Sequence, residues 1–192
     1  MKKFIPPIIA VAFICLMFSR PGLASITRVS GTEFSNIVKT DQTRLHLKGA
    51  AMLTYLLFIE AYAGALYLPE EIDGSRALDD VAKQLVLEYR VSISSEDLAK
   101  ATLEQIRSSV SSQTFTQLLP DIEALNRLYK SVKPGDRYSL TYTPGTGTQL
   151  IHNKTLLGTI KGAEFAKAMF GIWIGSNPID TRFRDRLLGK RR

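Results

Sequence analysis

Hydrophobic and polar residues alternate in two parts of the chain, and this pattern predicts β-strands. In residues 44–47 the apolar Leu45 and Leu47 alternate with polar neighbours. Residues 85–93 carry an apolar side chain at every second position, which is the period of a half-buried strand. Between them, residues 56–68 are almost continuously apolar and aromatic. We interpret this run as a buried strand, although a buried helix would give a similar pattern.

If residues 56–68 form a strand, their side chains divide between two faces of a sheet. Glu60 and Tyr62 share one face with Phe58, Gly64 and Leu66. The opposite face carries mainly small side chains, which favour an element packed close against it, such as a helix.

Helical spacing and capping signals predict helices in the second half of the chain. Ser94 and Asp97 form a capping box, which is typical of a helix start. Pro120 followed by Asp121 indicates the start of a second helix. Three further helical segments are expected at residues 78–84, 163–174 and 180–188.

Three short runs at residues 138–143, 149–152 and 156–160 are separated by tight turns and therefore predict antiparallel strands. Strands, then helices, then strands and again helices is an order typical of the α+β class, with helices layered on one face of an antiparallel sheet.

Residues 1–24 have the layout of a secretory signal peptide. Two lysines precede an apolar run that is shorter than the roughly 20 residues needed to span a bilayer. Gly22 and Ala24 supply small residues at the −3 and −1 positions of a cut before Ser25. We therefore expect a cleaved signal and a periplasmic protein, the alternative being a retained N-terminal anchor.

Residues 25–192 are expected to form a single domain, because no repeat or linker divides them. Signal removal lowers the formal net charge from +7 to +4, since 22 basic and 18 acidic residues remain. Residues 182–192 are strongly basic, which predicts at most a weak contact with membrane surfaces and otherwise a solvated terminus. Nothing indicates a nucleic-acid partner.

The residue types disfavour metal sites and classical hydrolysis. The only cysteine, Cys15, lies in the signal segment, and His46 and His152 are the only histidines. They form no paired metal-ligand motif, and the chain has no GxSxG motif for a serine nucleophile. We expect neither a metal nor a cofactor, and the catalytic residues, if there are any, are unknown.

Several short segments, in their order and spacing, resemble the bacterial secreted branch of the chalcone isomerase-like family. Together they cover most of residues 49–189. They are GAAMLTYLLFIEAYAGALYL (49–68), LVLEYR (85–90), PGD (134–136), YTPGTGT (142–148), Gly158, GAEF (162–165), WIG (173–175), Pro178 and LLG (187–189).

The resemblance implies an open-faced β-sandwich, in which a large antiparallel sheet carries helices on one face and a ligand cleft lies between the layers. Some plant relatives isomerise chalcones by intramolecular ring closure, and others bind fatty acids without catalysis. The family's enzymes hold an anionic oxygen with an arginine near the start of the first long strand. Residues 50–54 match that region, and they end at Thr54 without an arginine. Because ring closure develops negative charge, this departure disfavours catalysis.

Four residues are candidates for ligand binding. Arg90 is the leading cation for an acidic ligand, with an exposed pairing to Glu88 as the alternative. Tyr62 matches a strand threonine of the enzymes and would cap a ligand head group, unless it is an ordinary core residue. Thr54 offers one hydrogen bond. Glu60 is either a carboxylate with a perturbed pKa or a solvated residue at a sheet end.

These observations predict a protein that binds a small apolar or fatty-acid-like ligand between sheet and helices, without catalysis. An intramolecular lyase of chalcone isomerase type, acting on an unsaturated carbonyl substrate, is the alternative enzyme. A module that interacts with other envelope proteins is the third hypothesis.

Overall fold

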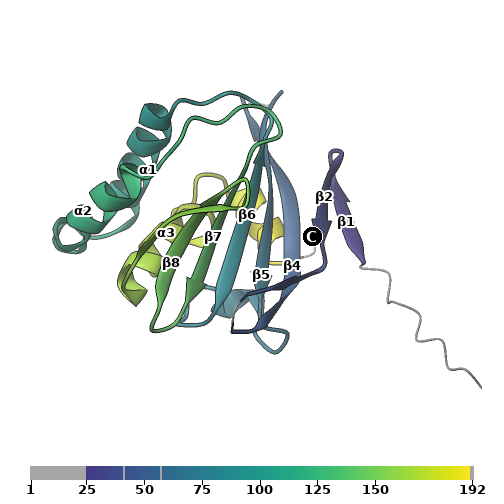
Figure 1. Cartoon of the computed structure of the whole chain (residues 1–192), viewed down its shortest axis with the longest axis horizontal. Coiled ribbons are helices and arrows are strands. Elements are labelled where there is room, and N and C mark those ends of the chain that lie inside the picture. The colour runs from purple at the N-terminus through teal and green to yellow at the C-terminus, as the bar shows by residue number, and fades with distance from the viewer. Residues whose placement is uncertain (1–24, 41, 57, 191–192) are drawn as a thin grey trace, which may run out of the picture.

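A seven-stranded antiparallel sheet forms the centre of the molecule (Figure 1). The computed structural model describes residues 25–40, 42–56 and 58–190. Strands that follow one another in sequence are neighbours in the sheet, so the topology is a simple meander. The strands are β3 (Ile37–Lys39), β4 (Arg44–Tyr55), β5 (Ile59–Leu68), β6 (Lys83–Tyr89), β7 (Arg137–Thr143), β8 (Gly147–His152) and β9 (Thr155–Ile160).

The helices gather against one face of this sheet, which confirms the predicted α+β arrangement. They are α1 (Ser95–Ser109), α2 (Ser112–Asn126), α3 (Ala163–Ile174) and α4 (Thr181–Leu187). Figure 1 shows α3 behind the sheet and the pair α1 and α2 on the side of β8. Alternate strand residues such as Leu85, Leu87 and Tyr89 pack with helix residues in the main core. This is the alternation that the sequence pattern predicted for β6.

On the opposite face of the sheet, an N-terminal hairpin instead of a helix packs against strands β4 to β6. The hairpin consists of β1 (Ile26–Val29) and β2 (Thr32–Ser35). Its residue Phe34 is buried in a second core cluster with Leu45, Ala63, Ala65 and Tyr67. The small residues of β5 do permit close packing, as expected, but the prediction of a helix on that face was wrong. A two-stranded ribbon is thin enough to pack closely against these small side chains.

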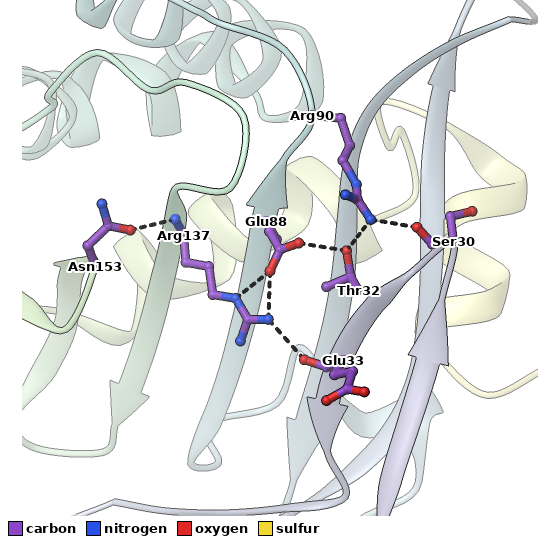
Figure 2. A network of polar contacts seen from close by, with 7 residues as sticks. All are labelled: Ser30, Thr32, Glu33, Glu88, Arg90, Arg137 and Asn153. Carbon is purple, nitrogen blue, oxygen red and sulfur yellow. Dashed lines mark hydrogen bonds and ion pairs between the residues drawn. The ribbon is translucent and has the colours of Figure 1, made fainter.

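A polar network fixes the hairpin to the sheet (Figure 2). The Glu88 carboxylate accepts hydrogen bonds from Arg137 Nε at 2.7 Å and from Thr32 Oγ1 at 2.8 Å. Arg90 Nη2 donates to Thr32 Oγ1 at 2.7 Å and to the Ser30 carbonyl. Two strands of the sheet thus hold the turn of the hairpin through charge-assisted bonds, which are stronger than neutral ones.

Several helix predictions are confirmed at their ends. The Ser94 hydroxyl accepts a hydrogen bond from the Asp97 amide and caps α1. Helix α3 has the predicted bounds, and Asp180 caps α4. The second helix, however, begins at its cap Ser111 and contains Pro120. The expected start at Asp121 was wrong. A proline inside a helix costs one backbone hydrogen bond, but the Ser111 cap and the buried apolar residues of α2 outweigh that loss.

Three other features also differ from the predictions. Residues 78–84 hold no helix; a short 3₁₀ turn, η1 (Gly74–Arg76), precedes β6 instead. Strand β6 ends at Tyr89, and Ile93 forms an isolated bridge with Val132. The apolar run at 56–68 is not one strand, because its first residues belong to a turn that precedes β5. The turn residues are themselves apolar, and Leu56 among them has a positive φ of 49°. Among the described residues, no helix is long and apolar enough to cross a bilayer.

Candidate functional site

A cavity of about 310 Å³ lies between the helix-facing side of the sheet and helices α1 and α3. Strands β5 to β8 form its floor, and α1, α3 and the segments that follow α2 and α3 form its walls. The lining residues are mostly apolar or aromatic: Tyr62, Leu87, Tyr89, Ile93, Asp97, Leu98, Ala101, Thr102, Glu104, Gln105, Tyr129, Tyr138, Leu140, Leu150, Ile172, Trp173 and Ile179.

The cavity has an exposed rim and a buried interior. Asp97, Ala101 and Glu104 recur at three- and four-residue intervals along α1, so they share one side of the helix, and all three are exposed. Ile179, which is 46% exposed, lies on the rim as well. The strand residues that line the floor are buried, and Tyr62 is 7% exposed. A ligand would therefore enter past α1 and reach an aromatic interior.

Tyr62 and Trp173 form a buried polar pair in this interior. Trp173, the only tryptophan of the chain, lies near the end of α3 and donates a hydrogen bond from Nε1 to the Tyr62 hydroxyl oxygen at 2.9 Å. Burial raises the pKa of the Tyr62 hydroxyl, although the hydrogen bond from Trp173 acts in the opposite direction. The Tyr62 hydroxyl therefore stays protonated and retains its own hydrogen as a donor.

Two further tyrosine hydroxyls of the cavity already have protein partners. The Tyr129 hydroxyl and Thr102 Oγ1 share a hydrogen bond of 2.9 Å. The Tyr138 hydroxyl accepts from the Lys130 amide at 2.7 Å and donates to the Lys130 carbonyl at 2.9 Å. Both of the Tyr138 interactions hold the segment after α2 against the sheet.

Tyr89 differs from these neighbours. Its side chain is 4% exposed and lines the cavity, with its ring 5.5 Å from that of Tyr62 and 6.2 Å from that of Tyr138. Its hydroxyl makes no hydrogen bond to any residue in the described ranges, but this atom is accessible and is not one of the buried polar atoms that lack a partner. Burial raises the pKa of Tyr89 well above its ordinary value, and the neighbouring tyrosines add to this effect. Tyr89 thus presents a neutral, unpaired hydroxyl to the cavity.

The charged side chains that line the cavity are negative and lie at its rim, and Asp180 adds a further negative charge near Tyr62. Asp97 and Glu104 are the only ionisable carboxylates among the described lining residues, and these residues include no lysine, arginine or histidine. The described part of the chain also contains no group of three or more histidine, cysteine, aspartate or glutamate residues arranged to hold a metal. The arrangement can bury an apolar body and donate neutral hydrogen bonds, but it offers no cation.

The structure brings only one of the four predicted ligand-binding residues to this cavity. Tyr62 lines it, whereas Arg90 binds the N-terminal hairpin on the opposite face of the sheet. The expected pairing of Arg90 with Glu88 was wrong, because Glu88 pairs with Arg137.

Thr54 and Glu60 lie elsewhere. Both are exposed near the tip of the β4–β5 hairpin, where they are partners in register. Thr54 borders a small separate hollow together with Arg182 and Arg186 of α4. Neither residue lines the cavity.

Sequence reasoning did not single out Tyr89, Thr102 or Tyr129 as site residues. Tyr89 and Tyr129 fitted the apolar periodicity of a strand and a helix, which placed them in the core. A usable signal was present, because aromatic residues that end in a hydroxyl require a partner when they are buried. Tyr62, Tyr89 and Tyr138 are such residues. They occupy helix-facing positions on neighbouring strands and form the polar part of the interior.

Comparisons with known proteins agree with this architecture. Residues 26–189 match the family model described as chalcone isomerase-like. A crystal structure of a fatty-acid binding protein from Arabidopsis thaliana is similar, with a TM-score of 0.66 and 15% identity over 83% of this chain and 92% of that protein. At this identity the likeness establishes a shared fold. The search of curated proteins gave no match.

Proposed function

The chain belongs to the chalcone isomerase-like family, and we propose that it binds a small apolar or amphipathic ligand, such as a fatty-acid-like chain, without catalysing a reaction on it. The observation that carries this proposal is the cavity between the sheet and the helices. The Arabidopsis protein of similar fold, which is a fatty-acid binding protein, supports the choice of ligand class.

The size and lining of the cavity suit such a ligand. Its volume of about 310 Å³ lies at the lower end of the roughly 300–1,000 Å³ found for small-molecule sites. Aliphatic and aromatic side chains together supply most of its wall, and each Å² of apolar surface removed from water contributes about 25 cal/mol. Affinity would come from this burial, and the tyrosine hydroxyls would orient the polar end of the ligand.

The electrostatics of the cavity disfavour the alternative of an intramolecular lyase. Ring closure on an unsaturated carbonyl substrate develops negative charge on oxygen, which needs a preorganised cation or strong donors. The described lining residues supply neutral hydroxyls and two carboxylates, and Arg90 lies across the sheet. A developing anion would be destabilised by Asp97 and Glu104 at the rim.

The sole tryptophan allows a direct test of binding. We expect hydrophobic ligands such as decanol to change the fluorescence of Trp173, and calorimetry to show saturable binding. Ala101→Phe at the rim should weaken binding by narrowing the entrance, whereas Lys100→Phe, at the adjacent exposed position outside the lining, should not. Equal binding by both variants would contradict a ligand site in this cavity.

We also propose that the protein works in the periplasm. Support comes from the signal-like residues 1–24, which lie outside the described residues. The full chain, expressed in a bacterial host with two membranes, should be recovered from the periplasm with Ser25 as its first residue. A product that keeps residues 1–24 and stays in the membrane fraction would instead indicate a retained anchor.

A weak contact with anionic membrane surfaces is a further proposal. The tip of the β4–β5 hairpin exposes four large apolar side chains: Tyr55, Leu56, Phe58 and Ile59. Arg182 and Arg186 lie beside this tip through their shared hollow with Thr54. Apolar side chains next to cations match the two components of an anionic lipid surface, acyl chains and charged head groups. Such a surface would also be the source of a poorly water-soluble ligand.

A further inference from the structure

We infer that the cavity selects ligands with an uncharged head group that accepts a hydrogen bond, such as an alcohol, an ester or a ketone, over carboxylates. This inference rests on the proposed function and narrows the chemical class of the ligand. It follows from the three aromatic residues at the polar end of the cavity, Tyr62, Tyr89 and Trp173, and from the charges around them.

Tyr89 and Tyr62 supply the hydrogen-bond donors. Tyr89 offers a hydroxyl that makes no hydrogen bond within the described ranges, although the residue is only 4% exposed. This hydroxyl is accessible and is not one of the buried polar atoms that lack a partner, so an acceptor on a bound ligand would satisfy it once the ligand had displaced solvent from the cavity. Tyr62, whose ring lies 5.5 Å from that of Tyr89, accepts the Trp173 hydrogen bond and keeps a hydrogen to donate. Two neutral donors therefore belong to paired positions of neighbouring strands that line the same cavity.

Both tyrosine hydroxyls are held in their protonated form. Burial raises the pKa of both Tyr62 and Tyr89. Asp180 and Tyr129 add to this effect at Tyr62, and Tyr62, Tyr129 and Tyr138 add to it at Tyr89. Both hydroxyls are therefore neutral around physiological pH and cannot act as a tyrosinate base or as an anionic partner for a cationic ligand. The ligand atom that they bind is a hydrogen-bond acceptor.

The described lining of the cavity does not compensate for a buried negative charge. A buried carboxylate is stable only when a cation or several strong hydrogen bonds compensate for its lost hydration. The described lining residues contain no cation, and Asp97 and Glu104 at the rim would raise the pKa of any carboxylic acid that entered. Arg90, the cation that the sequence suggested, is engaged with Ser30 and Thr32 on the other face (Figure 2). A fatty acid would therefore bind mainly in its protonated form.

The test compares decanol, decanoate and decylamine, which share one alkyl chain and differ in head group. Trp173 fluorescence and calorimetry would report binding to the full-length protein. Near neutral pH we expect decanol to bind at least about tenfold more tightly than decanoate, a difference of about 1.4 kcal/mol. Decanoate affinity should rise towards that of decanol as the pH falls to the ordinary pKa of a carboxylic acid. Decylamine should bind more weakly than decanol.

A matched pair of variants tests the role of the unpaired hydroxyl. Tyr89→Phe should weaken decanol binding about three- to tenfold, the effect of one hydrogen bond, while leaving the free energy of unfolding nearly unchanged, since that hydroxyl has no described protein partner. Tyr67→Phe, a buried tyrosine on the opposite face of the sheet, should leave decanol affinity unchanged.

The outcomes separate the inference from the function on which it rests. Binding of decanoate or decylamine as tight as that of decanol near neutral pH would overturn the inference and leave the proposed function intact. Unchanged decanol affinity in Tyr89→Phe would likewise overturn the assigned donor. If none of the three compounds binds, the proposed function itself fails.

Discussion

Trp173 of α3 and Tyr62 of β5, which are 111 positions apart in sequence, are joined by a buried hydrogen bond of 2.9 Å. The bond connects the helix layer to the sheet at the polar end of the cavity. Tyr62 also contacts Phe183 of α4 edge-on, with 5.8 Å between the ring centroids. The same tyrosine therefore stabilises the packing of two helices and lines the cavity.

Tyr62→Phe should destabilise the fold, because the indole N–H of Trp173 would lose its acceptor while it remains buried. We expect the free energy of unfolding to fall by about 1–3 kcal/mol, the usual cost of an unsatisfied buried donor. Urea unfolding followed by circular dichroism would measure it. Tyr67→Phe on the same strand is the control, and an equal loss in both variants would show that the bond to Trp173 is not the cause.

Lys83 should make stability rise with pH. Its side chain is 1% exposed, its amine lies 5.0 Å from the centroid of the Tyr142 ring, and burial lowers its pKa to about 8 from an ordinary value of 10.5. Between these two values the unfolded chain binds more protons than the folded chain, so raising the pH favours the folded state. The stability of the natural protein relative to Lys83→Met should therefore increase by about 1–3 kcal/mol between neutral pH and pH 10.

Urea unfolding of both proteins across this pH range would give the difference. Using the difference removes the titration of tyrosines, which both proteins share. Lys100→Met, at an exposed position of α1, provides the control and should show no such slope. A difference between the natural protein and Lys83→Met that does not vary with pH would contradict the assignment of the burial cost to Lys83.

Gly49→Ala should be strongly destabilising. A Cβ atom at Gly49 would lie 2.7 Å from the Leu187 carbonyl oxygen and closer still to that of Arg186, and both are backbone atoms of α4 that cannot rotate away. We expect a loss of more than about 2 kcal/mol from overpacking. Gly171→Ala in α3 is the matched control, because a Cβ there meets nothing within 4 Å. It should raise helix stability by about 0.5–1 kcal/mol. Thermal unfolding would rank the two variants, and the reverse order would refute the packing argument.

Glu88→Ala should loosen the N-terminal hairpin without weakening ligand binding. The change removes the partner of Arg137 and Thr32 on the face opposite the cavity (Figure 2). We expect faster limited proteolysis near β1 and β2, with unchanged decanol affinity. Arg90→Ala should behave in the same way, since Arg90 contacts Ser30 and Thr32. A marked loss of ligand affinity in Arg90→Ala would show that Arg90 takes part in ligand binding after all.

Phe58→Ser should reduce co-sedimentation with vesicles that contain an anionic phospholipid, if the hairpin tip contacts membranes. Phe58 is 78% exposed at the hairpin tip. Ile26 is 50% exposed, but it belongs to β1 of the N-terminal hairpin and not to the tip. Ile26→Ser is therefore the control and should sediment like the natural protein. Vesicles of phosphatidylcholine alone should retain less of each protein, because the arginines beside the tip would lack their partners. No sedimentation of the natural protein with anionic vesicles would refute the contact.

The local sequence determined most of the secondary structure, because periodicity and capping are properties of neighbouring residues. The alternation in β6, the capping of α1 by Ser94 and the bounds of α3 followed from short segments. Predictions failed where a local signal was overruled, as at Pro120 inside α2. The apolar turn between β4 and β5 was missed because it contains no glycine, proline, asparagine or aspartate in the described positions.

The sequence also determined the family and the α+β class, because its short motifs follow one another in the order typical of the family. Only the tertiary structure decided where the candidate residues point. Alternation assigns Tyr62 and Arg90 to faces of their strands, but it does not say which face the helices cover and which the N-terminal hairpin covers. That choice depends on contacts between residues far apart in sequence, such as Trp173 with Tyr62 and Arg90 with Thr32, and it is these contacts that leave the cavity neutral inside and place the cation outside it.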